Sequence, residues 1–426
     1  MKITLFEIFA ISLVLLVSES LSDSLYLSHR RCSPVGTSVV TTRLDGSSDS
    51  CICHPPPPST TTIHSPPPHK WVRRHRPPQA TWKCTTIAAL TTKAAPTVTT
   101  NGLENSLVLL KEAKVKLRRI SVQGAPIQKG QPKKGVENGP MLIRSSGIVE
   151  FLQDVGHDIL DYGNIHLGEI FNAASVGGNV SIHDPADVGE ATHHIYNNTK
   201  QILEENRFPL TFGGDHALAI GTLSAMSEYY PDLAGIYIDA HADINTVDTS
   251  PSGNMHGMPL SFVINELYGC NSNLTDFSWV AARIPAANVA HIALRDVDPG
   301  ETAIIDRLGM ASFTMRDIDR YGIRRVVDLT LDRIKGKTRP LYVSMDIDSL
   351  DDMEIGSTTG TPVPGGLTLR EALAMIEDLY RSANIVGFEL AEVNPALGSE
   401  EAGRRVAEIS RHILACVFGS CYGRRV

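Results

Sequence analysis

The sequence has too little of several features to fit some common classes of protein. Its 426 residues include only seven cysteines, of which Cys270, Cys416 and Cys421 lie beyond residue 103. Because so few cysteines fall in the larger part of the chain, a disulfide scaffold is not expected there, and that part should be stable without bridges. The mostly apolar run over residues 5–17 is too short for a comfortable membrane span, so stable membrane insertion is not expected either.

Acidic residues are absent from residues 50–103, which are rich in Pro, Ser, Thr and Arg. A segment of this composition cannot bury a core, which predicts a disordered or polyproline-like basic tail over residues 25–110. Before it, Lys2, the apolar run and the small residues that follow predict a signal-peptide-like segment over residues 1–24. This favours secretion. A cytoplasmic or mitochondrial location is the alternative, since basic, hydroxyl-rich segments also resemble transit peptides.

Charge is unevenly distributed along the chain. Residues 1–103 contain ten Lys and Arg and five Asp and Glu, which gives a net charge of +5. Because the whole chain has a net charge of −8, the remaining residues have a net charge of −13. An acidic remainder excludes the basic footprint of a nucleic-acid-binding protein. It suits a protein that gathers carboxylates around metal ions and binds a cationic substrate.

Five segments share one pattern, in which a short apolar run stops at a carboxylate, a histidine or both. They span residues 209–216, 234–243, 291–298, 341–348 and 385–394. Short runs rich in Ile, Val and Tyr, separated by helix-length stretches, predict buried parallel strands of an α/β domain over residues 111–426. We also expect a first strand over 117–123, an amphipathic helix over 148–159, and a helix that starts at a Thr368–Glu371 capping box.

The ends of these runs carry acid and imidazole groups. In open α/β folds the ligand crevice lies beyond the carboxyl ends of the strands. If alternate residues stay extended, the side chains of Asp239, His241 and Asp243 share a face, and Asp346 and Asp348 repeat the pattern. Taken singly, each Asp could cap a helix and each His could pack in a core. Together they predict a two-metal site for hard or borderline ions, with six ligands: His216, Asp239, His241, Asp243, Asp346 and Asp348.

A family resemblance supports this prediction. Gly213-Gly214-Asp215-His216, Asp239-Ala240-His241-Ala242-Asp243 and Ser344-Met345-Asp346-Ile347-Asp348 closely resemble the three metal-binding signatures of the ureohydrolases. That family includes the arginases and agmatinases, which cleave guanidino groups to urea at a manganese pair. The resemblance runs from about Lys116 to Gly419 and is closest to animal-type arginases. It implies a three-layer α/β/α sandwich around a mainly parallel sheet, two Mn²⁺ ions per subunit and a homotrimer.

The resemblance also implies which guanidino compound is bound. Residues matching Asn245, Ser252 and Asn254 hydrogen-bond the α-carboxylate of L-arginine in arginases. Asp298, more than Asp296, matches the contact to the α-amino group, and Thr361 matches a threonine near the nucleophile. Agmatine lacks the carboxylate and would leave these donors unpaired, so L-arginine is the expected substrate. Without the resemblance, Ser252-Gly253-Asn254 would be an ordinary turn.

The same resemblance implies the catalytic residues. His256 matches the histidine that shuttles protons to and from the metal-bound water, and Glu392 matches the acid that pairs with the guanidinium. In the implied reaction a hydroxide between two Mn²⁺ ions attacks the guanidinium carbon. The ornithine amine then leaves, protonated through Asp348 or His256, and urea follows.

The chain departs from the family at one loop near the proposed metal ligands. Asp352 stands where the family usually has proline, and the stretch from Asp351 to Thr361 is one residue longer than in typical animal arginases. We expect a looser turn and an added negative charge near the metals. Two rivals remain at this point: an amidinohydrolase for another guanidino acid such as guanidinobutyrate, and a catalytically weak binding protein on the same scaffold. A substrate panel tests the first, and manganese content tests the second.

Overall fold

The computed structural model describes residues 116–167, 182–281 and 283–421, together with three short strands nearer the N-terminus. By contacts the chain divides into two compact units, Met1–Asn105 and Ser106–Val426. In the first unit, β1 (Val39–Thr42), β2 (Ser48–Ile52) and β3 (Thr85–Ile87) form an antiparallel sheet. The signal-like segment over residues 1–24 and the rest of the predicted tail lie outside the described residues.

The second unit is built on a sheet of eight strands that all run parallel, in the order β5-β4-β6-β11-β10-β7-β8-β9. The five segments predicted as strands are confirmed, and they occupy five adjacent positions in the middle of the sheet. The first strand starts and ends two residues later than predicted. The strands are β4 (Arg119–Ala125), β5 (Asp158–Asn164), β6 (Phe208–Gly213), β7 (Ala234–Ile238), β8 (Val289–Leu294), β9 (Ala311–Thr314), β10 (Pro340–Asp346) and β11 (Asn384–Ala391).

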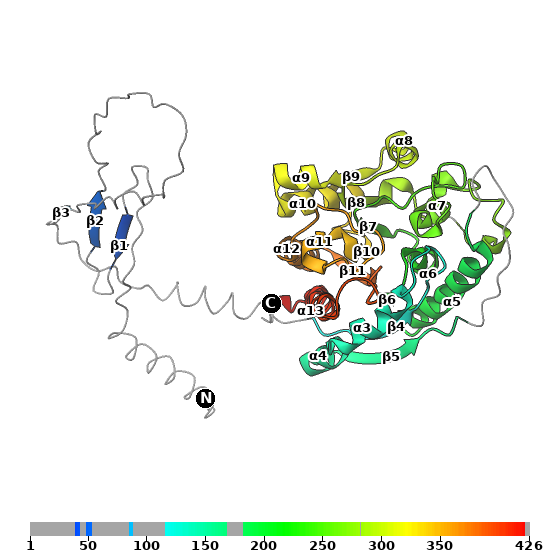
Figure 1. Cartoon of the computed structure of the whole chain (residues 1–426), viewed down its shortest axis with the longest axis horizontal. Helices are drawn as coiled ribbons and strands as arrows, with labels where there is room; N and C mark the ends of the chain where they lie inside the picture. The colour runs from blue at the N-terminus through cyan, green and yellow to red at the C-terminus, as the bar shows by residue number, and fades with distance from the viewer. Residues whose placement is uncertain are drawn as a thin grey trace, which may run out of the picture. The chain divides into compact units, whose positions relative to one another are not determined.

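Helices cover both faces of this sheet, so the predicted three-layer α/β/α sandwich is confirmed (Figure 1). One layer contains α3 (Gly139–Ser145), α4 (Ile148–Val155), α9 (Met315–Tyr321), α10 (Ile323–Ile334), α11 (Asp352–Ile355), α12 (Leu369–Ser382) and α13 (Glu400–Val417). The other contains α5 (Pro185–Glu204), α6 (Ala219–Tyr229), α7 (Pro259–Val263) and α8 (Pro299–Leu308).

The strands divide the core into two parts, as alternation of side chains requires. In β10, Leu341, Val343 and Met345 pack with the layer that contains α12, whereas Tyr342 faces the layer that contains α6. Both faces are buried, which explains why the central strands are continuous apolar runs rather than alternating ones.

One predicted helix is wrong at its end. The apolar spacing predicted a helix over 148–159, but α4 ends at Val155. Gly156 has a φ of 107°, a left-handed conformation that ends the helix, and Ile159 lies in β5. The capping box at the start of α12 is confirmed, because Thr368 Oγ1 accepts from Glu371 N and Glu371 Oε2 accepts from Thr368 N.

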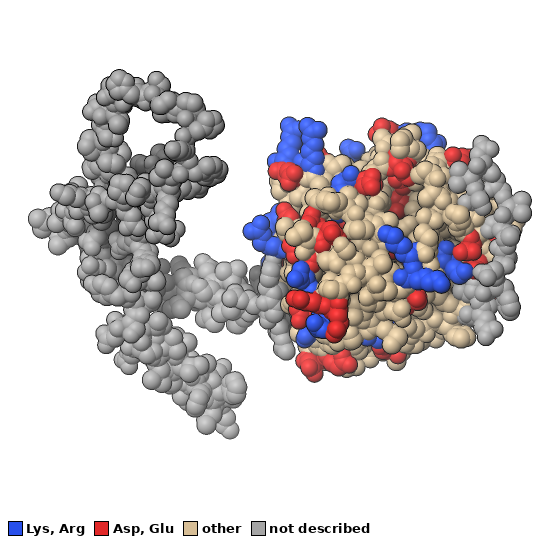
Figure 2. Space-filling model, viewed as in Figure 1, with Lys and Arg blue, Asp and Glu red and all other residues tan. Residues whose placement is uncertain are grey.

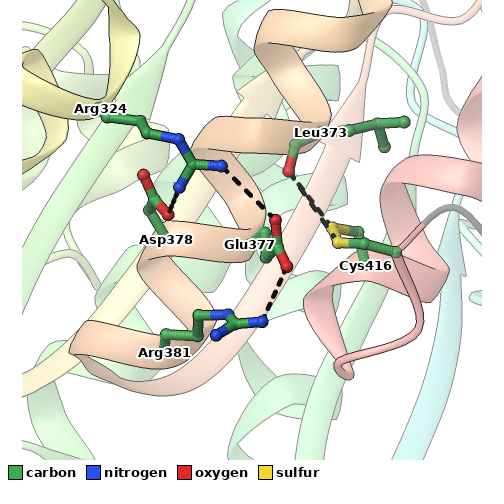
Figure 3. Close-up of a disulfide and its surroundings, with 7 residues drawn as sticks. Arg324, Leu373, Glu377, Asp378, Arg381 and Cys416 are labelled. Atoms are coloured by element: carbon green, nitrogen blue, oxygen red, sulfur yellow. Dashed lines mark hydrogen bonds and ion pairs between the residues drawn. A yellow bond between two sulfur atoms is a disulfide. The ribbon is translucent and has the colours of Figure 1, made fainter. Parts of the chain in front are cut away.

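A disulfide that the sequence argument did not predict joins Cys416 in α13 to Cys421 (Figure 3). Cys416 Sγ also lies 3.4 Å from the carbonyl oxygen of Leu373 in α12, close to the ion pair between Arg324 and Glu377. The two cysteines are only five positions apart, so the bridge closes a short loop and restricts the unfolded chain little.

The surface of the second unit carries acidic and basic side chains interspersed on the face drawn in Figure 2. Among the described residues, no helix is both long enough and apolar enough to cross a membrane.

Candidate active site

The carboxyl ends of β6, β10 and β7, of which β10 and β7 are adjacent and β11 separates β10 from β6, bring the six predicted metal ligands together. His216 follows β6, Asp239 comes directly after β7, and Asp346 is the last residue of β10. The Nδ1 atom of His216 lies 3.1 Å from Asp239 Oδ2, 3.4 Å from Asp243 Oδ2 and 3.2 Å from Asp346 Oδ2. A single imidazole nitrogen thus faces three carboxylates that come from two strands.

Five of the six predicted ligands, all but Asp346, fall into two groups that could each hold a cation, and Asp239 belongs to both. One group is His216, Asp239 and Asp243, and the other is Asp239, His241 and Asp348. In the second, His241 Nδ1 lies 3.4 Å from Asp239 Oδ1 and 3.2 Å from Asp348 Oδ2. A carboxylate shared between two groups is the arrangement that a pair of closely spaced ions requires.

The donor set fits a pair of divalent cations such as Mn²⁺. All the ligand atoms are carboxylate oxygens or imidazole nitrogens, which suit such ions better than soft metals. Asp239 Oδ2 is buried, with the Nδ1 atom of His216 3.1 Å away, and a buried carboxylate is costly unless positive charge, such as that of a cation, lies beside it.

The backbone aims these ligands differently from the extended geometry expected from the sequence. β7 ends at Ile238. Asp243 has a φ of 49°, a left-handed backbone conformation that residues other than glycine rarely adopt. Asp348 lies in a 3-10 turn, where its N–H donates to Asp346 Oδ1 over 2.7 Å. The side chains therefore converge through bent segments, so the predicted ligands come together but the predicted extended backbone is wrong.

Burial and mutual repulsion make the site electrostatically strained without cations. Burial first, then neighbouring carboxylates, raises the pKa values of Asp243, Asp346 and Asp348. Burial alone would lower the pKa of His216, but hydrogen bonds to Asp239 and Asp346 raise it well above its ordinary value. For Asp239, burial acts to raise the pKa, but contacts with the two histidines outweigh it and lower the pKa. The buried carboxylates of this site therefore favour binding of positive charge.

A cavity of about 140 Å³ opens beside these ligands. It is lined by two further classes of predicted residue, the substrate-binding and the proton-transferring ones. The lining residues are His241, Asp243, Asn245, Ser250, Ser252, His256, Gly257, Asp296, Asp298, Glu301, Asp346 and Thr361. Asn254, Glu392 and Asp348 are not among them, so the structure brings most but not all of the predicted site residues to the cavity wall.

One end of the cavity is polar and hydrogen-bonded. Asn245 Nδ2 donates to Asp298 Oδ2 over 2.9 Å, and Asn245 Oδ1 accepts from Thr249 Oγ1. Ser252 Oγ accepts from the N–H of Asn254, which fixes the turn that carries both residues. This end offers amide and hydroxyl groups beside carboxylates, a combination that can bind a carboxylate and an ammonium group together.

At the other end, His256 pairs with Glu392. His256 Nδ1 lies 3.0 Å from Glu392 Oε1, and this oxygen also accepts from the N–H of His216 over 2.9 Å. Burial disfavours charge on His256, but the hydrogen bond and the charge of Glu392 raise its pKa to about 9. Glu392 Oε2 is buried and has no hydrogen-bond partner among the described residues. A cationic donor would satisfy it.

Thr361 reaches the site through a loop held at both ends. Its Oγ1 donates to Asp348 Oδ2 over 3.0 Å, which places it beside a predicted ligand. The guanidinium of Arg295 donates to carbonyl oxygens on both sides of the loop, including those of Asp348, Leu350 and Val363. Arg295 thus fixes Asp348 and Thr361 relative to each other.

The sequence led us to expect that Asp352 would loosen its turn, but in the structure its side chain forms bonds within that turn. It is the first residue of α11, and its carboxylate accepts from Ser357 N over 2.9 Å and from Ser357 Oγ over 3.1 Å. Both bonds are exposed to solvent. The carboxylate of Asp352 therefore ties the start of this turn to Ser357.

Sequence reasoning missed three residues that shape the site: Arg295, Glu301 and Tyr237. Glu301 accepts from the N–H groups of Asp298 and Ile244, and Tyr237 donates to Asp243. The pair Asp298 and Glu301 has capping-box spacing, so a search for helix starts could have found Glu301. No sequence signal marks the other two.

Comparison with known proteins agrees with this geometry. Residues 118–417 match the family described as "Arginase family". The chain is 42% identical over 307 residues to human Arginase-1, covering 71% of this chain and 94% of the relative. It is 40% identical over 308 residues to the hepatic arginase of Aquarana catesbeiana, covering 72% and 93%. The solved arginase of Bacillus caldovelox has 34% identity and a TM-score of 0.64, over 71% of this chain and 99% of that one.

Fold, site and relatives together define a metal-dependent amidinohydrolase. The chain belongs to the arginase family, and its relatives include animal arginases. The residues before 118 lie outside the family match.

Proposed function

We propose that this chain hydrolyses L-arginine to L-ornithine and urea at two Mn²⁺ ions. The observation that carries the proposal is a cavity with cation ligands at its base and polar hydrogen-bonding groups along its wall. The relatives named above are arginases, which supports arginine as the substrate. Six residues would hold the ions: His216, Asp239, His241, Asp243, Asp346 and Asp348.

The wall of the cavity suits the amino-acid end of arginine. Asn245 and Ser252 can donate to the α-carboxylate, with Asn254 on the same turn as a further donor. Asp298 can accept from the α-ammonium group, and Asp296 lies nearby on the same segment. A substrate without the carboxylate would leave these donors unpaired, so agmatine should be a poor substrate.

Glu392 and His256 suit the guanidinium end. The unpaired Oε2 of Glu392 can accept from the guanidinium and orient its carbon. Because His256 Nδ1 is bonded to Glu392, Nε2 is the ring nitrogen that can take and give protons. Thr361 holds Asp348 in place beside the reacting atoms.

When bound, the ions would supply a water that ionises near neutral pH and positive charge against the developing negative charge. A water oxygen adds to the guanidinium carbon and loses its protons, and the bond from this carbon to the ε-nitrogen of arginine breaks. The leaving amine gains both protons, at least one of them passed through Asp348 or His256, and departs as an ammonium group. Urea and ornithine are the products.

Urea release by the full-length chain tests the proposal. The assay compares L-arginine, agmatine and guanidinobutyrate as substrates, each with and without added Mn²⁺. The expected result is manganese-dependent urea from arginine only. Urea from guanidinobutyrate instead would make the chain an amidinohydrolase for another guanidino acid, and two bound ions without urea from any substrate would leave a binding protein.

The family resemblance further supports a homotrimer, and the N-terminal segment supports secretion. Sedimentation of the purified protein tests the first. N-terminal sequencing of the mature protein from its native source tests the second.

A further inference from the structure

Tyr237 occupies an unusual position behind one of the two ligand groups. It is the fourth residue of β7 and is 1% exposed. Its neighbours Ile236 and Ile238 face the helix layer that contains α12, whereas Tyr237 faces the opposite layer. Its side chain therefore points to the same side of the chain as Asp239, two residues further on.

The phenol contacts two predicted metal ligands at once. Its hydroxyl donates to Asp243 Oδ2 over 2.8 Å, and its ring stacks on the imidazole of His216 with centroids 4.4 Å apart and planes 16° apart. The ring of His291 packs edge-on against Tyr237, with centroids 6.1 Å apart. Packing against His291 thus restricts the Tyr237 ring, and Tyr237 in turn restricts His216 and Asp243.

Both contacted residues belong to the same ligand group. His216 and Asp243 form, with Asp239, the first of the two groups. Within the described part of the chain, Tyr237 makes no hydrogen bond or ring contact with His241 or Asp348 of the second group. We propose that Tyr237 is a positioning residue for one ion of the proposed metal pair. This inference rests on the proposed function, because it deepens the role of the same site.

Asp243 needs such support more than the other ligands do. Its backbone has a φ of 49°, a left-handed conformation that is strained for a residue other than glycine and that none of the other five predicted ligands adopts. A hydrogen bond from a fixed phenol restricts rotation of the carboxylate, while stacking restricts the imidazole. Partners that orient metal ligands in this way typically change metal affinity about 10–100-fold when they are removed.

A second buried tyrosine provides a control that distinguishes positioning of metal ligands from the general effect of removing a buried hydroxyl. Tyr342 in β10 is also fully buried and faces the same layer, and its hydroxyl donates to Glu389 Oε2 over 2.7 Å. Glu389 is not a predicted ligand. Loss of the hydroxyl from Tyr342 should therefore destabilise the fold in a similar way without affecting either ion.

The experiment compares full-length wild type with Tyr237→Phe and Tyr342→Phe. Each protein is stripped of metal and dialysed against a series of free Mn²⁺ concentrations, and bound manganese per chain is measured by elemental analysis. Thermal unfolding is recorded at each concentration. Tyr237→Phe should bind one ion about 10–100-fold more weakly and the other as wild type does, with a smaller manganese-dependent rise in Tm. Tyr342→Phe should match wild type in both ions.

Two results would overturn the inference: unchanged affinity for both ions in Tyr237→Phe, or equal weakening in Tyr342→Phe. Wild type that binds two ions but releases no urea would count against the proposed function alone, and the comparison of variants would still decide the role of Tyr237. Wild type that binds no manganese would refute both.

Discussion

Glu301 gives the chain a pH dependence of stability that can be worked out from the structure. Its side chain is 3% exposed and accepts from Ile244 N over 3.1 Å and from Asp298 N over 3.0 Å. It therefore joins the segment after Asp243 to the segment that carries Asp298. Burial raises its pKa from 4.5 to about 7, because the two backbone donors only partly replace the lost hydration.

The perturbation is Glu301→Gln, which keeps the shape and removes the charge. Below pH 4.5 the acid is protonated in the folded and unfolded states, and burial costs nothing extra. Between pH 4.5 and about 7 the unfolded chain releases its proton first, so the free energy of unfolding falls as pH rises. The loss above pH 7 amounts to about 3 kcal/mol.

Glutamine escapes this loss but can accept only one of the two N–H groups, at a cost of about 1 kcal/mol at every pH. Glu301→Gln should therefore be about as stable as wild type near pH 5, where the loss in wild type roughly equals the cost of glutamine, and about 2 kcal/mol more stable near pH 8. Guanidinium chloride unfolding of the metal-stripped chain at several pH values measures both, since metal binding would add its own pH dependence.

Glu371 provides the matched control. It occupies the same capping-box position in α12 but is only partly buried, so Glu371→Gln should lack the gain at high pH. A constant difference between wild type and Glu301→Gln from pH 5 to pH 8 would refute the reasoning. Such a result would mean that the folded chain stabilises the charged form of Glu301 as strongly as water does in the unfolded chain.

Three further predictions concern the metal ligands, the proton shuttle and the altered loop. Asp239→Asn should weaken binding of both manganese ions, by about 100-fold or more, because this carboxylate belongs to both ligand groups; elemental analysis measures it, and loss of one ion only would contradict it. His256→Asn should lower kcat of urea release about 10²–10⁴-fold with unchanged manganese content. Asp352→Ala should lower the free energy of unfolding by about 1 kcal/mol and leave manganese affinity unchanged, since its bonds close an exposed turn; a large loss of manganese would restore the view that it acts on the metals.

The sequence predicts the centre of the sheet because those strands are buried on both faces. A strand covered by helices on both sides must be apolar throughout, and such runs are visible without any partner. The edge strands β5 and β9 were not predicted. β5 is mostly exposed or half-buried along Asp158–Asn164 and β9 is half-buried, so neither needs an apolar run. The helix predicted over 148–159 failed for the related reason that Ile159 packs as part of an edge strand.

The metal ligands were predictable because parallel strands deliver their ends to one edge, whatever the backbone does afterwards. The supporting residues were not. Arg295 contacts carbonyl groups 53 and 68 positions further along the chain, and Glu301 bonds to an N–H group 57 positions before it. Such contacts depend on how loops from different strands meet, and short-range patterns do not encode that.

The charges of the proposed metal ligands, the cavity wall and the substrate can be compared directly. The four carboxylates of the proposed ligand set, Asp239, Asp243, Asp346 and Asp348, carry four negative charges, which two divalent ions would neutralise. Asp296, Asp298 and Glu301 then remain on the cavity wall, and Glu392, which is not part of the wall, pairs with His256. Arginine brings a guanidinium and an ammonium group against one carboxylate, so its net positive charge opposes this surplus. Agmatine is still more cationic, and charge alone would favour it. Discrimination must therefore come from the donors at Asn245 and Ser252, which agmatine has no carboxylate to engage, and substitution of those donors should raise activity toward agmatine relative to arginine.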